Sequence, residues 1–323
     1  RRGGAWPDAS VANPDTFIEG NFSIDLYEGN GSTQTITTGI DSANKSSLVW
    51  IKNRDAADSH VLTDTVRGAT KILHSDTSAA EATDADTITA FSSTGFALGD
   101  DVKVNTNNES YCAWTFKKAP KFFDVVTYTG SGSAKTVAHS LGGTVGMILI
   151  KNLDQTDNWA VYHRGADGSA PEDKYLILNT TAAVADSAAW WNDTAPTTSV
   201  FTVGTDGDVN GNGVAYISYH FATVANVSKV GSFTQSGATN VACGFTGDTP
   251  SFILLKRTDD TGDWLVFDSV RGIVAGNDKS LDLNNTDAEV TNADVVDPYS
   301  GGFATTSSLT NGDYIFYAIA ATS

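Results

Sequence analysis

The sequence is poor in methionine, cysteine, glutamate and basic residues, and each scarcity argues against a class of protein. Among 323 residues there are one Met, two Cys and six Glu. Two cysteines, Cys112 and Cys243, are too few for a disulfide framework, and no Cys/His group has the spacing of a structural zinc site. With 20 Lys+Arg against 38 Asp+Glu the formal net charge is −18, so neither nucleic acid nor an anionic membrane surface is an expected partner.

Long apolar runs are also missing from the sequence. The longest uninterrupted run, residues 314–321, has eight residues. A membrane-spanning helix needs roughly 18 to 20 such residues. We therefore predict a soluble protein with no membrane insertion.

The abundant residues favour strands joined by turns. The chain has 40 Thr, 30 Gly and 32 Asp, a composition that suits β-structure better than helices. Hydrophobic residues make up 40% of the chain and aromatic residues 10%, which is enough for a sizeable core, so the acidity does not indicate disorder. The predicted fold class is all-β.

Three copies of one pattern, about 100 residues apart, run through the chain. Residues 47–53, 146–152 and 251–257 are apolar segments that contain a lysine, and a second segment begins eight residues after that lysine. Strand, acidic turn, strand is the simplest interpretation. The recurring charged residues are Lys52, Lys151 and Lys256, then Asp55, Asp154 and Asp259 three residues later, and Arg67, Arg164 and Arg271, each followed by Gly.

Each copy closes on a segment in which apolar residues alternate, namely residues 111–116, 216–221 and 314–319. That alternation predicts a strand with one face in a core, and the continuous apolar run before each lysine predicts a central strand covered on both sides. We therefore predict three tandem β-sandwich modules, jelly-roll or lectin-like and about 100 residues long. The predicted boundaries are a linker or tether at 1–20 and modules at 21–119, 120–226 and 227–323, joined by short connections into a stiff array.

Residues that recur in all three copies are expected to maintain the fold, because a reaction needs its residues only once. We expect each repeated lysine to reach a turn carboxylate. We expect each repeated arginine to form an ion pair or to cap a turn. Function is then expected where the copies differ.

One such difference is an aromatic pair in the second copy. Trp190, Trp191, Asn192 and Asp193 have no counterpart in the other copies. A sugar ring stacks on an exposed aromatic while amide and carboxylate groups bind its hydroxyls, so this segment is a candidate ligand-binding site. The alternative is that both tryptophans pack beneath a long loop as a small secondary core.

A second difference resembles the start of a calcium-binding loop. Asp206, Asp208 and Asn210 stand at alternate positions before Gly211, as oxygen ligands do in such loops. The match to an EF-hand then fails, because Ile217 occupies the position that needs a bidentate Glu. A structural Ca²⁺ site completed by other loops is one interpretation, and ordinary turn composition is the other. No cofactor is required by either.

The sequence has no motif that identifies an enzyme. The five histidines are scattered, and neither a G-x-S-x-G nor an H-E-x-x-H motif occurs. None of the six glutamates stands in a repeated or aromatic-framed position that would single it out as a catalytic acid. We predict a non-enzymatic protein and assign no catalytic residue.

Several elements of the repeat together resemble a known family. The residues that carry the resemblance are 128–132, 148–152, 159–163, 200–204 and 209–213, and residues 11–14 are similar to the family's inter-module linker. The chain resembles the repeated β-rich modules, of no assigned biochemical function, in predicted tail-fibre and virion surface proteins of marine tailed phages. The third copy departs most, at residues 235–237 and 309–312.

The resemblance implies a virion structural protein, a tail fibre or surface appendage that displays loops for attachment to a host surface glycan or protein. Its expected partners are other virion proteins and copies of itself, with a homotrimer favoured. The numbering begins at Arg1 and the sole methionine is Met147, so we expect a processed product or part of a longer chain. Two alternatives are a self-assembling filament or capsid-decorating subunit without glycan binding, and a carbohydrate-binding array of a secreted enzyme or adhesin.

Overall fold

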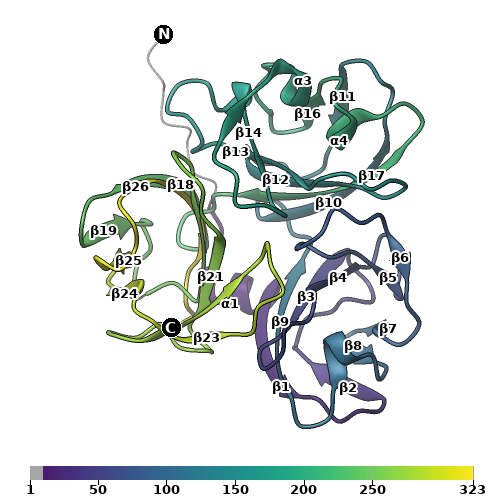
Figure 1. The fold of residues 1–323 in the computed structure, drawn as a ribbon, viewed down its shortest axis with the longest axis vertical. Helices are drawn as coiled ribbons and strands as arrows, with labels where there is room; N and C mark the ends of the chain where they lie inside the picture. Colours follow the sequence, from purple (N-terminus) through teal and green to yellow (C-terminus); the bar gives the residue numbers. More distant parts are fainter. Residues whose placement is uncertain (1–9, 248, 323) are drawn as a thin grey trace.

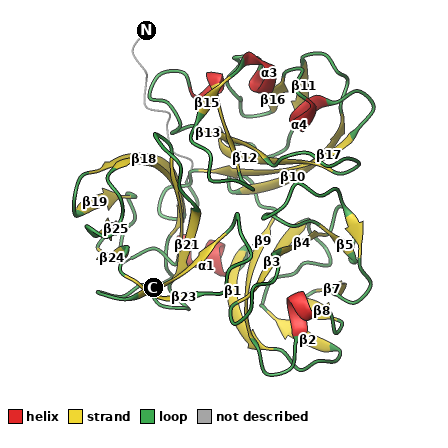
Figure 2. Cartoon of the chain, in the orientation of Figure 1, coloured by secondary structure: helices red, strands yellow, loops and turns green. Residues whose placement is uncertain are grey.

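The all-β class is confirmed by the computed structural model, which describes residues 10–247 and 249–322. Strands dominate it, and the sheets are antiparallel throughout the described residues. The helical segments are short, and Figure 2 shows α3 (Ala188–Trp191) and α4 (Gly207–Asn210) on the outer side of the second copy. No helix in the described ranges is long and apolar enough to cross a membrane.

We call the three copies repeat 1, repeat 2 and repeat 3. Repeat 1 has a four-stranded sheet in the order β1-β9-β3-β4, a three-stranded sheet β2-β8-β7 and the pair β5-β6. Its elements are α1 (Pro14–Glu19), β1 (Phe22–Glu28), β2 (Gln34–Thr37), β3 (Ser47–Asn53), β4 (Val61–Asp64), β5 (Lys71–Ile72), β6 (Ala82–Thr83), β7 (Ile88–Ser92), β8 (Gly95–Leu98), α2 (Val102–Asn105) and β9 (Ser110–Lys117).

Repeat 2 has a six-stranded sheet in the order β10-β17-β12-β13-β14-β15, where repeat 1 has four strands, and the separate pair β11-β16. Its elements are β10 (Phe123–Thr129), β11 (Lys135–Ala138), β12 (Val145–Asn152), β13 (Ala160–His163), the 3-10 helix η1 (Pro171–Asp173), β14 (Lys174–Ile177), β15 (Ala185–Asp186), α3 (Ala188–Trp191), β16 (Val200–Val203), α4 (Gly207–Asn210) and β17 (Ala215–Ala222).

Repeat 3 has the sheets β18-β26-β20-β21-β22-β23 and β19-β25-β24. Its elements are β18 (Ser228–Gln235), β19 (Thr239–Ala242), β20 (Phe252–Arg257), β21 (Trp264–Asp268), β22 (Asp278–Asp282), β23 (Val290–Ala293), β24 (Val296–Tyr299), β25 (Gly302–Thr305) and β26 (Gly312–Ile319). The first four strands of the larger sheet follow the same order as in the other repeats. We call this larger sheet the inner sheet of each repeat and the other main sheet its second sheet.

The lysine-bearing strand has the same register in all three inner sheets. Lys52 lies opposite Cys112, Lys151 opposite Ile217 and Lys256 opposite Ile315, each on the strand that closes the repeat. The lysine strand also pairs with the strand after the acidic turn, as the pattern predicts.

Every residue of β3 and β12 is buried, because each strand is covered on both faces. In β12, Ile148 and Ile150 point into a cluster shared with the second sheet of repeat 2, where Phe201 and Val203 lie. Met147 and Leu149 point the other way, into a cluster that contains residues of all three repeats.

The second covering is a core common to the whole chain. Figure 1 shows the three inner sheets arranged around one centre, so the repeats form a closed triangle and not an extended array. A small cavity of about 20 Å³ lies at that centre and is lined by residues of each repeat. They include Trp50, Trp114, Phe116, Met147, Leu149, Phe221, Phe252, Leu254 and Tyr317.

Part of the stretch predicted as a linker joins this core. Pro14 stands in the first turn of α1, Asn13 accepts a hydrogen bond from Thr16 N as its N-cap, and Ile18 is buried in the common core. Residues 1–9 of that predicted linker lie outside the described residues.

A common core predicts that the three repeats unfold together. Leu149→Ala is expected to lower the free energy of unfolding by about 2–5 kcal/mol, because it leaves a cavity lined by all three repeats. Calorimetry should show one transition with a lowered midpoint, and Ile148→Ala, on the opposite face of the same strand, is the matched control for lost strand packing. Three separable transitions, or a variant that shifts only one of them, would contradict the common core.

Candidate functional site

The repeated lysines are buried and bind backbone carbonyls. Lys52 Nζ donates to Asn53 O at 2.6 Å and Ala56 O at 3.1 Å. Lys256 Nζ donates to Gly262 O at 2.6 Å and to Thr181 O of repeat 2 at 3.0 Å. Burial lowers the pKa of each lysine to about 8. We expected each lysine to reach a turn carboxylate. Among the described residues, none of the three forms an ion pair, and each Nζ binds backbone carbonyls instead.

The repeated aspartates hold the turn against the closing strand. Asp55 accepts a hydrogen bond from Ser110 N at 2.6 Å, and Asp154 accepts one from Ala215 N at 2.8 Å. In repeat 3, Asp259 also accepts a backbone hydrogen bond from Asp313 of the closing strand, and its side chain forms an ion pair with Arg257 Nε at 2.7 Å. That these aspartates serve only the fold stays a prediction.

Two of the three repeated arginines form buried ion pairs at equivalent positions. Arg67 pairs with Asp64, and Arg271 Nε lies 2.5 Å from Asp268, in each case three residues after the aspartate. Arg164 is not equivalent, because it directly follows His163, the residue that stands where the other repeats have aspartate. The shared Arg-Gly pattern therefore overstates the similarity of repeat 2.

We call the boundaries between inner sheets seams 1/2, 2/3 and 3/1. At each seam a ring N–H of one repeat donates to a backbone carbonyl of the preceding repeat. The bonds are Trp159 Nε1 to His74 O at 2.8 Å, Trp264 Nε1 to Ile177 O at 3.0 Å and His60 Nε2 to Asp282 O at 3.0 Å. Repeat 3 thus contacts repeat 1 as repeat 1 contacts repeat 2, and the ring is closed.

A second set of seam contacts is made by the closing strands. Tyr219 OH donates to Asp64 at 2.7 Å across seam 1/2, and Trp114 Nε1 donates to Asp268 at 3.1 Å across seam 3/1. At seam 2/3, His163 Nε2 donates to Phe316 O at 3.1 Å while its Nδ1 accepts from Gly165 N. Burial lowers the pKa of His163 to about 3, which keeps this ring neutral.

Seam 3/1 has no covalent connection and is crossed by a charge network. Glu289 binds Arg54 of repeat 1 at 2.8 Å and Arg271 at 3.3 Å. At the position of Arg54, repeat 2 has Leu153 and repeat 3 has Thr258. The side chain of Glu289 is only 4% exposed, so this pair is desolvated and depends on both partners.

Removal of Glu289 should therefore weaken ring closure. Glu289→Ala is expected to lower the free energy of unfolding by about 3–5 kcal/mol, because Arg54 loses its carboxylate partner inside the protein and Arg271 is left with Asp268. The matched variant Glu81→Ala removes a more exposed carboxylate from seam 1/2 and should cost about 1 kcal/mol. Urea unfolding measures both, and equal costs would contradict the special role of seam 3/1.

Acid should destabilise the fold through its buried histidines. Burial lowers the pKa of His60, His163 and His220 from the usual 6.5 to about 3. Below pH 6.5 the unfolded chain binds protons that the folded chain does not. The free energy of unfolding therefore decreases as the pH is lowered, by about 1.4 kcal/mol per pH unit for each histidine. Urea titrations between pH 7 and 5 measure this slope.

The variant His60→Gln retains a donor for Asp282 O and removes one titrating group. It is expected to reduce the slope of the unfolding free energy against pH by about 1.4 kcal/mol per pH unit, the contribution of one proton. An unchanged slope in this variant would show that His60 is not buried as a neutral ring.

Both tryptophans of the predicted sugar platform lie inside repeat 2. Trp190 is 4% exposed and stacks on Tyr175 with ring centroids 3.8 Å apart, and Trp191 is 1% exposed and donates to Lys174 O at 2.9 Å. Asn192 and Asp193 are exposed, and both have positive φ where α3 ends. A stacking platform would need the rings at the surface, so the packing alternative describes this pair.

The segment that resembles a calcium-binding loop, residues 206–210, caps helix α4 and forms hydrogen bonds to neighbouring turns. Asp206 caps α4 by accepting from Asp208 N at 2.9 Å, and Asp208 accepts from Asn158 N at 3.0 Å. Asn210 Oδ1 accepts from Ser131 N at 2.8 Å and its Nδ2 donates to Gly204 O.

Repeat 1 has the same arrangement with different charges. Asp101 caps α2 and Asn105 accepts from Asn30 N at 2.8 Å, while Lys103 stands at the position of Asp208. Turn composition therefore accounts for the motif. In the parts of the chain that the structure describes, no group of three or more His, Cys, Asp or Glu side chains is placed to hold a metal ion.

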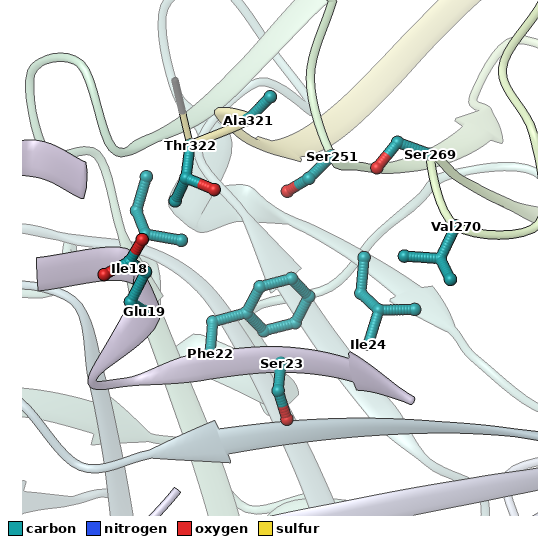
Figure 3. A pocket seen from close by; sticks show the side chains of 10 residues that line it. All are labelled: Ile18, Glu19, Phe22, Ser23, Ile24, Ser251, Ser269, Val270, Ala321 and Thr322. Atoms are coloured by element: carbon teal, nitrogen blue, oxygen red, sulfur yellow. The ribbon is translucent and has the colours of Figure 1, made fainter. Parts of the chain in front are cut away.

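Two open grooves lie along the seams, and the sequence patterns predicted neither. The 3/1 groove, about 230 Å³, is bordered by α1, β1 and the start of β20; Figure 3 shows Phe22 and Ile24 pointing from β1 toward Ser251 and Val270. The 2/3 groove, about 450 Å³, lies between the loop after β13 and strand β18. The polar residues in its lining include Asp167, Ser232, Thr234, Thr258 and Asp313.

These features define an all-β protein built from three copies of one strand pattern closed around a common core. Residues 20–322 match the family described as a domain of unknown function (DUF7483), and the chain belongs to that family. The match spans all three repeats and carries no indication of phage origin or tail-fibre association. Comparison with curated proteins found no match.

Proposed function

We propose that the protein is a non-enzymatic structural component of a virion surface, a tail fibre or appendage that presents loops to a host glycan or surface protein. The observation that supports this best is the closed ring of seams. It makes three repeats into one rigid body whose second sheets face outward, as Figure 1 shows for β16 and β25. A rigid scaffold with variable loops is how many binding surfaces are held in place.

Each repeat is proposed to be a β-sandwich module. In repeat 1 the outward residues of β3, Val49 and Ile51, share a buried cluster with Ile36, Phe96 and Leu98 of the second sheet. Repeat 2 has the equivalent cluster between β12 and β16. A sandwich with its own small core explains how loops change at the outer edge without disturbing the common core.

The proposed partners are other virion proteins and further copies of the chain, with a homotrimer favoured. A threefold appendage needs closed cyclic contacts, whereas a filament or capsid-decorating layer needs contacts that repeat without closing. No cofactor is required, and a structural Ca²⁺ is part of the proposal only if assembly depends on it.

Two measurements test the proposal. Antibodies against the purified chain should label appendages of purified virus particles, and mass spectrometry should find the chain in those particles. Its absence from particles would overturn the virion assignment and favour the alternative of a carbohydrate-binding array from a secreted enzyme or adhesin.

Light scattering on residues 1–323, with calcium and then with a chelator, tests the assembly. A discrete trimer is expected for a fibre. Open-ended growth would overturn the trimer and favour the filament or decoration subunit, and dissociation by the chelator alone would assign a structural role to Ca²⁺.

A further inference from the structure

The 2/3 groove exists because the loop after β13 lies directly against strand β18. A Cβ added to Gly165 would lie 3.0 Å from Gly231 O and 3.0 Å from Ser232 Cβ, so the contact depends on glycine in the loop. The loop and the strand form the two walls of the groove. Thr258, in the turn after β20, and Asp313, in β26, complete its lining.

Two carboxylates in this groove keep acceptor capacity. Asp167 Oδ1 accepts from Ser169 N at 2.8 Å and from Ala170 N at 3.1 Å, which lowers the pKa of this carboxyl and keeps it ionised. Asp313 Oδ1 accepts from Thr234 Oγ1 at 2.7 Å. Within the described chain, the second oxygen of each carboxylate accepts no hydrogen bond, so both are available to a ligand.

The chemistry of the groove selects against anions. No Lys, Arg or His is among the ten described residues that line it. Beside the two carboxylates stand the hydroxyls of Ser232, Thr234 and Thr258. Ser232 can donate and accept, whereas Thr234 and Thr258 donate their protons to Asp313 Oδ1 and Asp313 O and are left as acceptors. Adjacent hydroxyl groups of a sugar are donors that suit such acceptors, and an ammonium group would be attracted by the same carboxylates.

This combination is confined to one seam. At the position of Ser232, repeats 1 and 2 have Leu26 and Thr127, each of which precedes the aromatic that pairs with the closing strand. At the position of Asp313 they have Ser110 and Ala215. At the position of Thr258 repeat 2 has Leu153, while in repeat 1 Arg54 is engaged with Glu289.

We propose that the 2/3 groove binds a neutral or amino sugar through the free carboxylate oxygens of Asp167 and Asp313 and the hydroxyls of Ser232 and Thr234. This inference rests on the proposed attachment function and names its ligand class and its place. It also replaces the tryptophan pair of repeat 2 as the site of sugar recognition.

The test is a glycan array that carries neutral, amino and sialylated or sulfated oligosaccharides, probed with the purified chain. The best binder is then titrated by calorimetry against three variants. Asp313→Ala introduces the residue that repeat 2 has at that position, so the fold is expected to be retained, and Asp167→Asn keeps the shape of the side chain. Asp100→Asn changes the same charge on an exposed residue of repeat 1 and is the matched control.

Neutral or amino sugars are expected to bind. Asp313→Ala and Asp167→Asn should each raise the dissociation constant at least tenfold without changing the unfolding midpoint, and Asp100→Asn should bind as the unchanged chain does. Binding only to anionic sugars, equal binding by all variants, or no binding at all would each overturn the proposal. The assay needs no virus particle, so failure here is separate from failure of the virion assignment.

Discussion

Three inner sheets bury one face each in a single core, and the rest of the structure depends on that burial. A strand such as β12 is apolar on both faces and needs two covers to remove its side chains from water. Its own second sheet supplies one cover, and only the other two repeats supply the second. The repeats are therefore parts of one folded unit, and their closed triangle follows from the pattern of a single strand.

Polar contacts at the seams specify how the sheets meet. Ring N–H groups bind carbonyls of the neighbouring repeat at equivalent positions, which holds the three sheets at similar spacing around the centre. Two seams also follow covalent connections, while seam 3/1 relies on non-covalent contacts alone. The charge network around Glu289 is placed at that seam, where ring closure has the least support from the chain itself.

Seam 2/3 differs from the other two seams at positions that are otherwise equivalent in the three repeats. His163 replaces the aspartate of the other repeats, and Tyr317 OH, which corresponds to Tyr219 OH at seam 1/2, has no carboxylate opposite it. The loop that follows His163 is rich in glycine and leaves the 2/3 groove open. A scaffold made of repeated positions thus carries the 2/3 groove where the repetition fails.

The sequence by itself determined the all-β class and the three copies of one strand pattern, while the structural role of the repeated lysines and aspartates stays a prediction. Alternating and continuous apolar segments report how many faces of a strand are buried, and that information is local. The closed ring, the burial of Trp190 and Trp191 and the two grooves were decided only by the tertiary structure. Each depends on residues far apart in the sequence, 85 to 222 positions for the ring N–H contacts at the seams, or on which face of a loop is covered. A periodic pattern does not record which partner provides the cover.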